Sequence, residues 1–123
     1  MKNTLLLLLF FSSLSFGGMT VKDYQEFKKD KNSLEWYFLG LGNGFAFSNT
    51  DLQSRGMTPL YCPPSDLKIT KEMLLTMLDN RIKEFSLKEK DDRNLPKLLD
   101  LQIEPMLLSK LAELYPCNPK IKS

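Results

Sequence analysis

Histidine is absent from this chain of 123 residues, and its absence excludes several kinds of chemistry. Without histidine there is no Ser-His-Asp arrangement, and the commonest general base is missing. The two cysteines alone cannot complete a four-ligand zinc site without carboxylates. Aspartate and glutamate are plentiful, but no pair of them stands in a recognisable apolar setting. We therefore expect a protein that is not an enzyme and that holds no metal and no cofactor.

A large excess of charge of either sign is also lacking. The chain has 17 basic and 15 acidic residues, which gives a formal charge of +2. This balance creates no global field that would capture nucleic acid or an anionic lipid surface. Segments that alternate apolar and polar residues are missing as well, so no β-strand is predicted. We expect a protein partner and no nucleic acid.

Long apolar runs are missing except at the start of the chain. Leu5–Phe11 is an unbroken apolar run after Lys2, and it is too short to span a bilayer of roughly 30 Å. Small residues follow, and Ser15 and Gly17 have the spacing that signal peptidase requires at −3 and −1. The pattern predicts a secretory signal peptide that is cut after Gly17.

An N-terminal membrane anchor is the alternative. It lacks support because neither a second long apolar segment nor a stop-transfer cluster of charges follows. No cysteine stands near the cut to carry a lipid. With an error of one or two residues on the cut, we therefore expect residues 1 to about 18 to be the signal peptide, and residues 19–123 to form one periplasmic domain without membrane insertion. Loss of Lys2 with the signal lowers the formal charge from +2 to +1.

Cys62 and Cys117 are the two cysteines of the chain. An exported chain meets an oxidising compartment, where an even, low count usually means a disulfide. A bridge between them would stabilise the fold by roughly 4 kcal/mol in the chain-entropy model. Both stand beside proline, in Tyr-Cys-Pro-Pro at 61–64 and Tyr-Pro-Cys at 115–117, so both are expected at helix ends in rigid loops. A metal pair and a reactive thiol are the alternatives.

Two helices are predicted in the first half of the domain. The first covers residues 21–29, with Thr20 as N-cap and Asp23 at the third helical position, where its carboxylate can bond back to the cap. The second begins after Ser33 as N-cap, and Gly56 ends it. Because its apolar residues recur at helical intervals, we expect it to be the central, most buried helix.

The second predicted helix contains three glycines, each of which costs about 1 kcal/mol relative to alanine inside a helix. Gly40 and Gly44 are one turn apart and share a face, so we expect them to let another helix pack closely. A kink near Asn43 is the alternative. The short Gly40–Gly42 element resembles the start of a dinucleotide-binding loop only superficially, because no strand precedes it.

Two more helices are predicted in the second half. The third begins near Thr70 as N-cap, and the fourth begins at Pro105, with Glu104 near the positive end of its dipole and Pro116 as its stop. A short apolar turn is expected over 98–101. The apolar face of the third helix is expected to contain Leu74, Leu75, Leu78, Ile82 and Phe85. The fold class predicted is all-α, a small disulfide-bonded bundle of four or five helices.

A run of mixed charge over residues 88–94 separates the third helix from the fourth. Such a run is usually a solvated loop or a frayed helix end. Loops held on a rigid scaffold also commonly carry binding function, so the segment 86–96 is our candidate for contact with a partner. The candidate contact residues are Lys88, Lys90, Asp91, Asp92, Arg93 and Asn94.

Four elements of the sequence resemble the Rap/Tai proteins, the immunity family of type VI secretion amidases. The elements are Gly-Met-Thr at 18–20, Tyr-x-x-Gly at 37–40, Tyr-Cys-Pro-Pro at 61–64 and Ala-Glu-Leu-Tyr-Pro-Cys at 112–117. That family consists of small helical, disulfide-bonded periplasmic proteins that are often dimeric. The resemblance implies a protein that binds and blocks a peptidoglycan amidase delivered by a neighbouring cell, and a homodimer is one expectation.

Two features depart from the family pattern. Many members carry an additional cysteine pair in the first two helices, and the segment 86–104 is longer and more charged than expected. A second interpretation is a small periplasmic acid-stress protein of the chaperone type. Such a protein would expose apolar surface as its carboxylates become protonated. An amidase gene beside this one would favour the immunity function.

Overall fold

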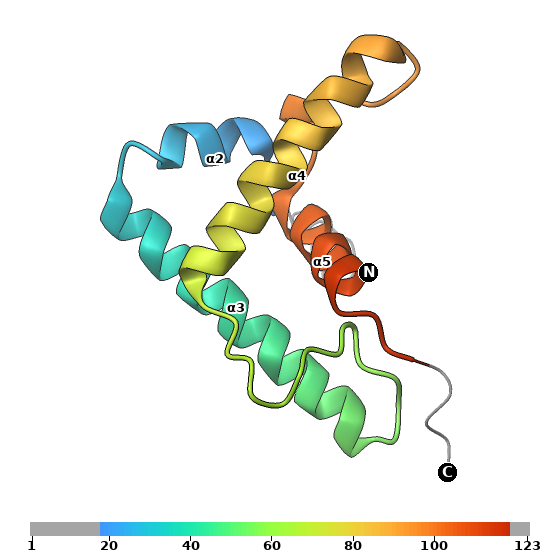
Figure 1. Cartoon of the computed structure of the whole chain (residues 1–123). Helices are drawn as coiled ribbons and strands as arrows, with labels where there is room; N and C mark the ends of the chain where they lie inside the picture. Colours follow the sequence, from blue (N-terminus) through green and yellow to red (C-terminus); the bar gives the residue numbers. More distant parts are fainter. Residues whose placement is uncertain (1–17, 119–123) are drawn as a thin grey trace, which may run out of the picture.

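The computed structural model describes residues 18–118, so the predicted signal peptide up to Gly17 lies outside the described residues. The described chain forms α2 (Val21–Phe27), α3 (Lys31–Ser54), α4 (Lys71–Asp91), the 3-10 helix η1 (Leu98–Asp100) and α5 (Ile103–Leu114) (Figure 1). Within 18–118 there is no strand, and an isolated antiparallel bridge joins Thr20 to Gln102. The predicted small all-α fold is confirmed.

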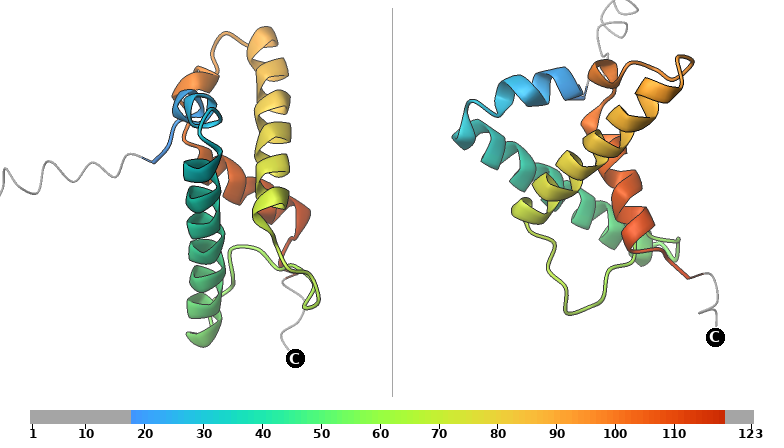
Figure 2. Two further views of the ribbon diagram at one scale, coloured as in Figure 1. Left: turned by 90° about the vertical axis from the view of Figure 1, so that its left-hand side faces the viewer. Right: turned by 45° about the horizontal axis from the view of Figure 1, so that its top comes forward.

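Helix α4 is the common packing partner of the fold. It contacts α3, α5 and η1, while α2 packs against η1 and α3. The right-hand view of Figure 2 shows α4 crossing over α3, with α5 running obliquely to both. The C-terminal end of α4 extends beyond the other helices, at the upper right of Figure 1. This arrangement leaves one end of α4 outside the packed body.

The hydrophobic core draws on every helix, but unequally. Helix α5 buries four of its 12 residues, whereas α3 buries only Leu34 and Phe38 among 24. The expectation that the second helix is the most buried is therefore wrong. The C-terminal half of α3 leads away from α4 and meets the connection 55–70 instead, so α5 takes the central place. The buried side chains are those of Val21, Tyr24, Leu34, Phe38, Tyr61, Leu74, Met77, Leu78, Leu98, Ile103, Met106, Leu107 and Leu111.

Helix α2 begins where the Thr20 and Asp23 capping pattern predicted. The Asp23 amide donates to Thr20 Oγ1 at 3.1 Å, and the Thr20 amide donates to Asp23 Oδ2 at 3.0 Å, which completes the predicted capping box. The predicted N-cap Thr70 is confirmed as well, because its hydroxyl oxygen accepts the Met73 amide at 3.2 Å. Helix α2 ends at Phe27, two residues before the predicted end at Lys29.

Two predicted helix starts are displaced. Helix α3 begins at Lys31 with Asp30 as N-cap, because the Asp30 carboxylate accepts both the amide and the hydroxyl of Ser33, at 3.3 and 2.6 Å. Helix α5 begins at Ile103 rather than at Pro105. Proline is accepted at this third helical position, since the first turn has no intrahelical partner for its N–H groups. Local signals thus located these helices to within a few residues.

The predicted disulfide is confirmed, since Cys62 and Cys117 are bridged with a Cα–Cα distance of 5.0 Å. The Cys62 amide also donates to the Tyr115 carbonyl oxygen at 2.7 Å. Cys62 is not at a helix end as predicted, because it lies in the middle of the connection 55–70. The bridge therefore fastens a long loop to the segment that follows α5.

The glycines of α3 do not behave as predicted within the chain. Apart from the neighbouring backbone of α3 itself, a Cβ built on Gly40 or Gly44 would have no atom within 4 Å, so this pair makes no close contact with another helix of the described chain. Gly42 is the glycine that faces another helix, and its Cβ would lie 3.1 Å from Leu74 Cδ1. The spacing correctly predicted a shared face, but that face points away from the core. Helix α3 also continues through Asn43 without a break, and Gly56, with φ of 69°, follows its end.

Candidate protein-binding surfaces

No group of three or more His, Cys, Asp or Glu side chains in 18–118 could hold a metal ion. Both cysteines are consumed by the disulfide. No helix within this range is long and apolar enough to cross a membrane. Three surface features remain as candidate sites: the projecting end of α4, a groove beside α3, and the outer face of α3.

The first feature is the α4 tip, which we define as residues 86–97. All six predicted contact residues belong to it and are exposed. The helix continues through Asp91, so Lys88, Lys90 and Asp91 lie on its last turn rather than in a loop. The two lysines there interact favourably with the negative end of the helix dipole, which explains why the helix persists into the charge run.

Asp92 closes the turn that follows the helix. Its amide donates to the Lys88 carbonyl oxygen at 3.1 Å, and its Oδ1 accepts the Asn94 amide at 2.9 Å. The Leu95 amide then donates to the Asp92 carbonyl oxygen at 3.3 Å. These bonds give the turn a defined shape. They also assign Asp92 a structural role, which its appearance in a charge run did not indicate.

The remaining charges of the α4 tip have no ionic partners within the described chain. Neither Lys88, Lys90, Asp91 nor Arg93 forms an ion pair with any residue of 18–118. Both signs of charge therefore remain available at the end of a projecting helix. A partner with charged groups in a recess could bind them without first breaking internal ion pairs.

The base of the tip is held by ion pairs between α4 and α5. Arg81 lies 3.1 Å from Glu113, and Lys110 lies 3.1 Å from both Glu84 and Glu113. Hydrogen bonds from Lys110 and then Arg81 lower the pKa of the Glu84 carboxyl group. Because Leu78 and Leu111 are also buried at this contact, the helix that carries the tip is fixed on the core.

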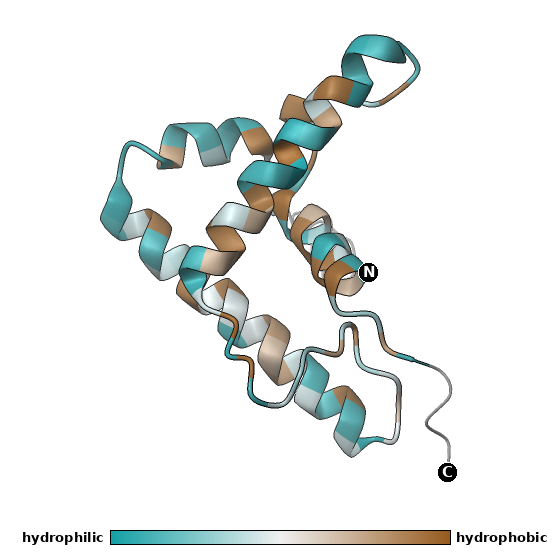
Figure 3. Ribbon diagram, viewed as in Figure 1, coloured by the Kyte–Doolittle hydropathy of each residue, from teal (hydrophilic) through white to brown (hydrophobic). Residues whose placement is uncertain are grey.

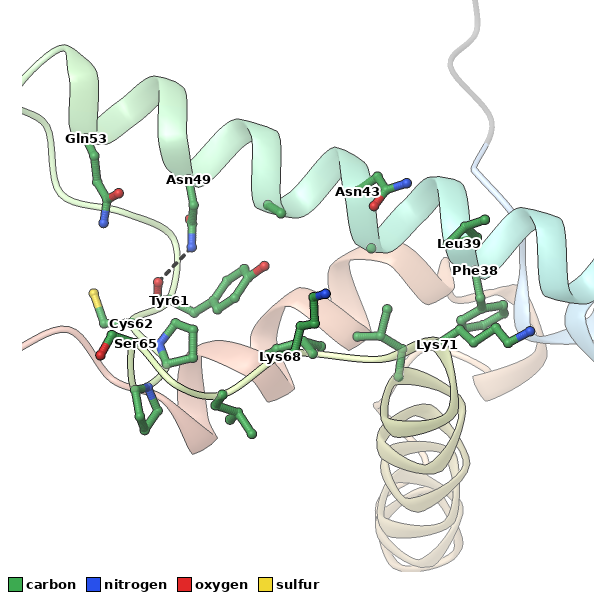
Figure 4. Close-up of a pocket in the computed structure, with 17 residues that line it drawn as sticks. Phe38, Leu39, Asn43, Asn49, Gln53, Tyr61, Cys62, Ser65, Lys68 and Lys71 are labelled. Carbon is green, nitrogen blue, oxygen red and sulfur yellow. Dashed lines mark hydrogen bonds between the residues drawn. The ribbon is translucent and has the colours of Figure 1, made fainter.

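The second feature is a groove of about 500 Å³ between α3 and the segment 61–71 (Figure 4). Asn49 shapes one end, since its Nδ2 donates to the Tyr61 carbonyl oxygen and its Oδ1 accepts the Leu60 amide, each at 2.8 Å. Lys68 and Lys71 line the opposite wall, but Lys71 is paired with Glu35 at 3.0 Å. The polar side chains of the groove thus mainly hold the connection in place.

The third feature is the outer face of α3, which we define by Trp36, Gly40, Asn43, Gly44 and Phe47. The Trp36 and Phe47 side chains are 73% and 75% exposed, although both are large and apolar. Helical spacing places them on one stripe, with the two glycines between them. Figure 3 shows pale and brown residues through the middle of α3.

No charged residue occurs between Trp36 and Thr50, although 26% of the chain is charged. This uncharged run is the sequence signal for the α3 face, because a surface helix that lacks charges over about four turns usually has a binding partner. The periodicity alone assigned the run to the core instead. An exposed uncharged helix face with two aromatic side chains is typical of interaction surfaces.

The four elements of the family resemblance meet in two places in the structure. Met19, from the first, and Tyr37, from the second, both donate hydrogen bonds to Glu104 Oε1. The third and fourth are joined by the disulfide. Comparison with family models, curated proteins and solved structures gives no match to this chain. The resemblance therefore rests on these sequence elements alone.

Proposed function

We propose that this protein is an exported inhibitor that binds and blocks a peptidoglycan amidase effector of a type VI secretion system, as an immunity protein does. The observation that carries the proposal is the α4 tip, a projecting helix end whose charges of both signs are unpaired within the described chain. The four sequence elements shared with the Rap/Tai family supply the class of partner.

The shape of the tip suits a hydrolase as partner. Active sites are concave, so an inhibitor needs a segment that protrudes while its scaffold stays packed. Lys88, Lys90 and Arg93 can pair with acidic groups at such a cleft, and Asp91 can accept hydrogen bonds from donors there. The α4–α5 ion pairs and the disulfide keep the scaffold rigid, which lowers the entropy lost on binding.

The experiment first searches the genes beside this one for a peptidoglycan amidase, and then measures binding and inhibition with that amidase. Lys90→Glu with Arg93→Glu should weaken binding at least tenfold, since two charges at the tip would be reversed. Asp92 is left intact in this variant because it closes the turn. The matched control is Lys22→Glu, at an exposed residue of α2 far along the chain from the tip.

The control should inhibit as the natural chain does. Equal inhibition by the tip variant and the natural chain would exclude the tip as the binding surface. Failure of the natural chain to bind the amidase at all would exclude the immunity function itself.

A second candidate function is favoured by the α3 face. A chaperone-type protein binds apolar segments of unfolded chains, and the exposed Trp36 and Phe47 side chains offer a surface for them. The test is suppression of aggregation of an acid-unfolded protein, compared between the natural chain and Trp36→Ser with Phe47→Ser. Loss of suppression in the variant would support this function. Equal suppression by both proteins would exclude the α3 face as the binding surface, and no suppression by the natural chain would exclude the function itself.

A further inference from the structure

Only one of the two carboxylate oxygens of Glu104, at the second position of α5, accepts hydrogen bonds. Its Oε1 accepts the Met19 amide at 2.8 Å and also the Tyr37 hydroxyl. Its Oε2 is buried and has no hydrogen-bond partner in 18–118. No lysine or arginine of this range forms an ion pair with Glu104 either. A buried carboxylate oxygen without a donor is destabilising, so this oxygen calls for a partner.

Gly18 lies directly against the unsatisfied oxygen. A Cβ built on Gly18 would be 2.4 Å from Glu104 Oε2 and 2.8 Å from Cδ, so a larger residue would collide with the carboxyl group. Because the nitrogen of Gly18 and the built Cβ are bonded to the same Cα, about 1.5 Å from it, the nitrogen also lies in the neighbourhood of Oε2.

The segment that carries Gly18 is fixed by its neighbours. The Ile103 amide donates to the Met19 carbonyl oxygen at 2.9 Å, and the Val21 amide donates to the Leu101 carbonyl oxygen at 2.9 Å. Together with the bridge between Thr20 and Gln102, these bonds hold residues 19–21 alongside the start of α5. The position of Gly18 beside Glu104 thus follows from a short ladder of main-chain bonds.

We propose that Gly18 is the first residue of the mature protein and that its α-ammonium group binds Glu104. Hydrolysis of the Gly17–Gly18 peptide bond by signal peptidase consumes one water molecule, leaves a carboxylate on Gly17 and leaves an amino group on Gly18, which takes up a proton. The new group has a positive charge and three donors, whereas the uncut amide is neutral and has one. Cleavage therefore creates the partner that Glu104 Oε2 lacks.

This inference is independent of the partner of the α4 tip. The proposed ion pair requires the cut after Gly17 that the −3, −1 spacing predicts, because only this cut makes Gly18 the N-terminal residue. The precursor lacks the ion pair and is less stable than the processed protein. Export machinery that transports unfolded chains would benefit from this difference, because the full stability of the fold appears only after processing.

The experiment compares two forms of the domain, each with Glu104 and with Glu104→Gln. One form begins at Gly18, and the other has one serine added before Gly18. With Glu104, the serine should lower the melting temperature by about 4–8 °C, since the ammonium group is moved away from the carboxylate. With glutamine, the serine should have no effect. Mass spectrometry of the exported protein should show Gly18 as the first residue.

A second measurement keeps the test valid if the glutamine variant does not fold. Titration of the α-amino group by NMR should give a pKa above the ordinary range of about 7.7–8.0 for the form that begins at Gly18. Acetylation of Gly18, which preserves Glu104 and removes the charge, should lower the melting temperature as the serine does. A different first residue, an ordinary amine pKa, or equal effects of the serine in both backgrounds would overturn the proposal.

Discussion

The Lys110 ammonium nitrogen lies 3.1 Å from Glu84 Oε1, and this ion pair joins α5 to α4 below the α4 tip. Arg81 and Glu113 extend it into a network across the same helix contact. Networks of charges are worth more than isolated surface pairs, although each exposed pair is weak. The network is therefore suited to measuring how the stability of the α4–α5 contact changes as the pH falls.

We predict that Glu84 stabilises the fold only above its acidic pKa range. Because the folded pKa of Glu84 is lowered, its contribution is present above the unfolded pKa of about 4.3 and is lost as the pH falls through the folded value. Glu84→Gln should therefore lower the melting temperature at pH 7, and the difference should vanish at pH 2. Thermal unfolding followed by circular dichroism measures both. A difference that persists at pH 2 would contradict the prediction.

We predict the opposite pH dependence for Tyr24, which is buried, and Tyr37, which is half-buried. Burial, and then the hydrogen bond to Asp79 Oδ1 at 2.9 Å, raise the pKa of Tyr24. Burial and the bond to Glu104 raise the pKa of Tyr37 in the same way. Their contribution to stability is present below the unfolded pKa of about 10 and is lost as the pH rises toward the folded values. Ultraviolet absorbance should show them ionising above pH 10, together with unfolding.

Tyr24→Phe is the control for that titration. It removes the hydroxyl and should lower the free energy of unfolding by about 0.5–1.5 kcal/mol at pH 7, since Asp79 keeps its ion pair with Lys28. The variant should also lose one of the late-ionising groups. An absorbance titration identical to that of the natural chain would show that Tyr24 is not among them.

We predict a large loss of stability when the disulfide is removed. Replacement of Cys62 and Cys117 by serine should lower the free energy of unfolding by about 2–5 kcal/mol, because the connection 55–70 would lose its covalent link to the end of α5. Denaturant unfolding measures the change. Thiol titration of the denatured, unreduced protein should find no free thiol, and two free thiols would refute the pairing in solution.

We predict that alanine is better tolerated at Gly44 than at Gly42, a nearby glycine of α3. Gly44→Ala should raise the free energy of unfolding by about 0.5–1 kcal/mol, since alanine favours the helix and its Cβ meets open space. Gly42→Ala should gain less or lose stability, because its Cβ comes 3.1 Å from Leu74 Cδ1. If Gly44→Ala destabilises and also changes the mass in solution, the α3 face is covered by a second copy of the chain.

Local signals in the sequence sufficed for several parts of the fold. Thr20 with Asp23, and Thr70 alone, identify helix starts because a cap acts on residues within one turn of it. Both cysteines and the export signal led to the disulfide by a chemical argument that needs no coordinates. The charge run at 88–94 correctly predicted an exposed segment after the third helix, because unpaired charges must reach solvent.

Other parts depend on contacts that spacing does not reveal. Periodicity shows that Gly40 and Gly44 share a face of α3, but not that the core covers the opposite face. Asp30 replaces Ser33 as N-cap because its carboxylate accepts two hydrogen bonds from Ser33 itself. Glu104 was expected only as a partner of the helix dipole, and its contacts with Met19 and Tyr37 join residues far apart in the chain.

The ladder between residues 19–21 and 101–103 also dictates an order of folding. Met19 bonds to Glu104 across 85 positions of sequence, and α2 packs on η1. Helix α2 leaves any synthesis or transport channel early and can pack on α3, but its partner η1 follows only near the end of the chain. Contacts of such long range slow folding, because the intervening chain must be ordered before they form. The domain consequently closes late, and a chain truncated before η1 should leave α2 without its contacts to η1 and to residues 101–103.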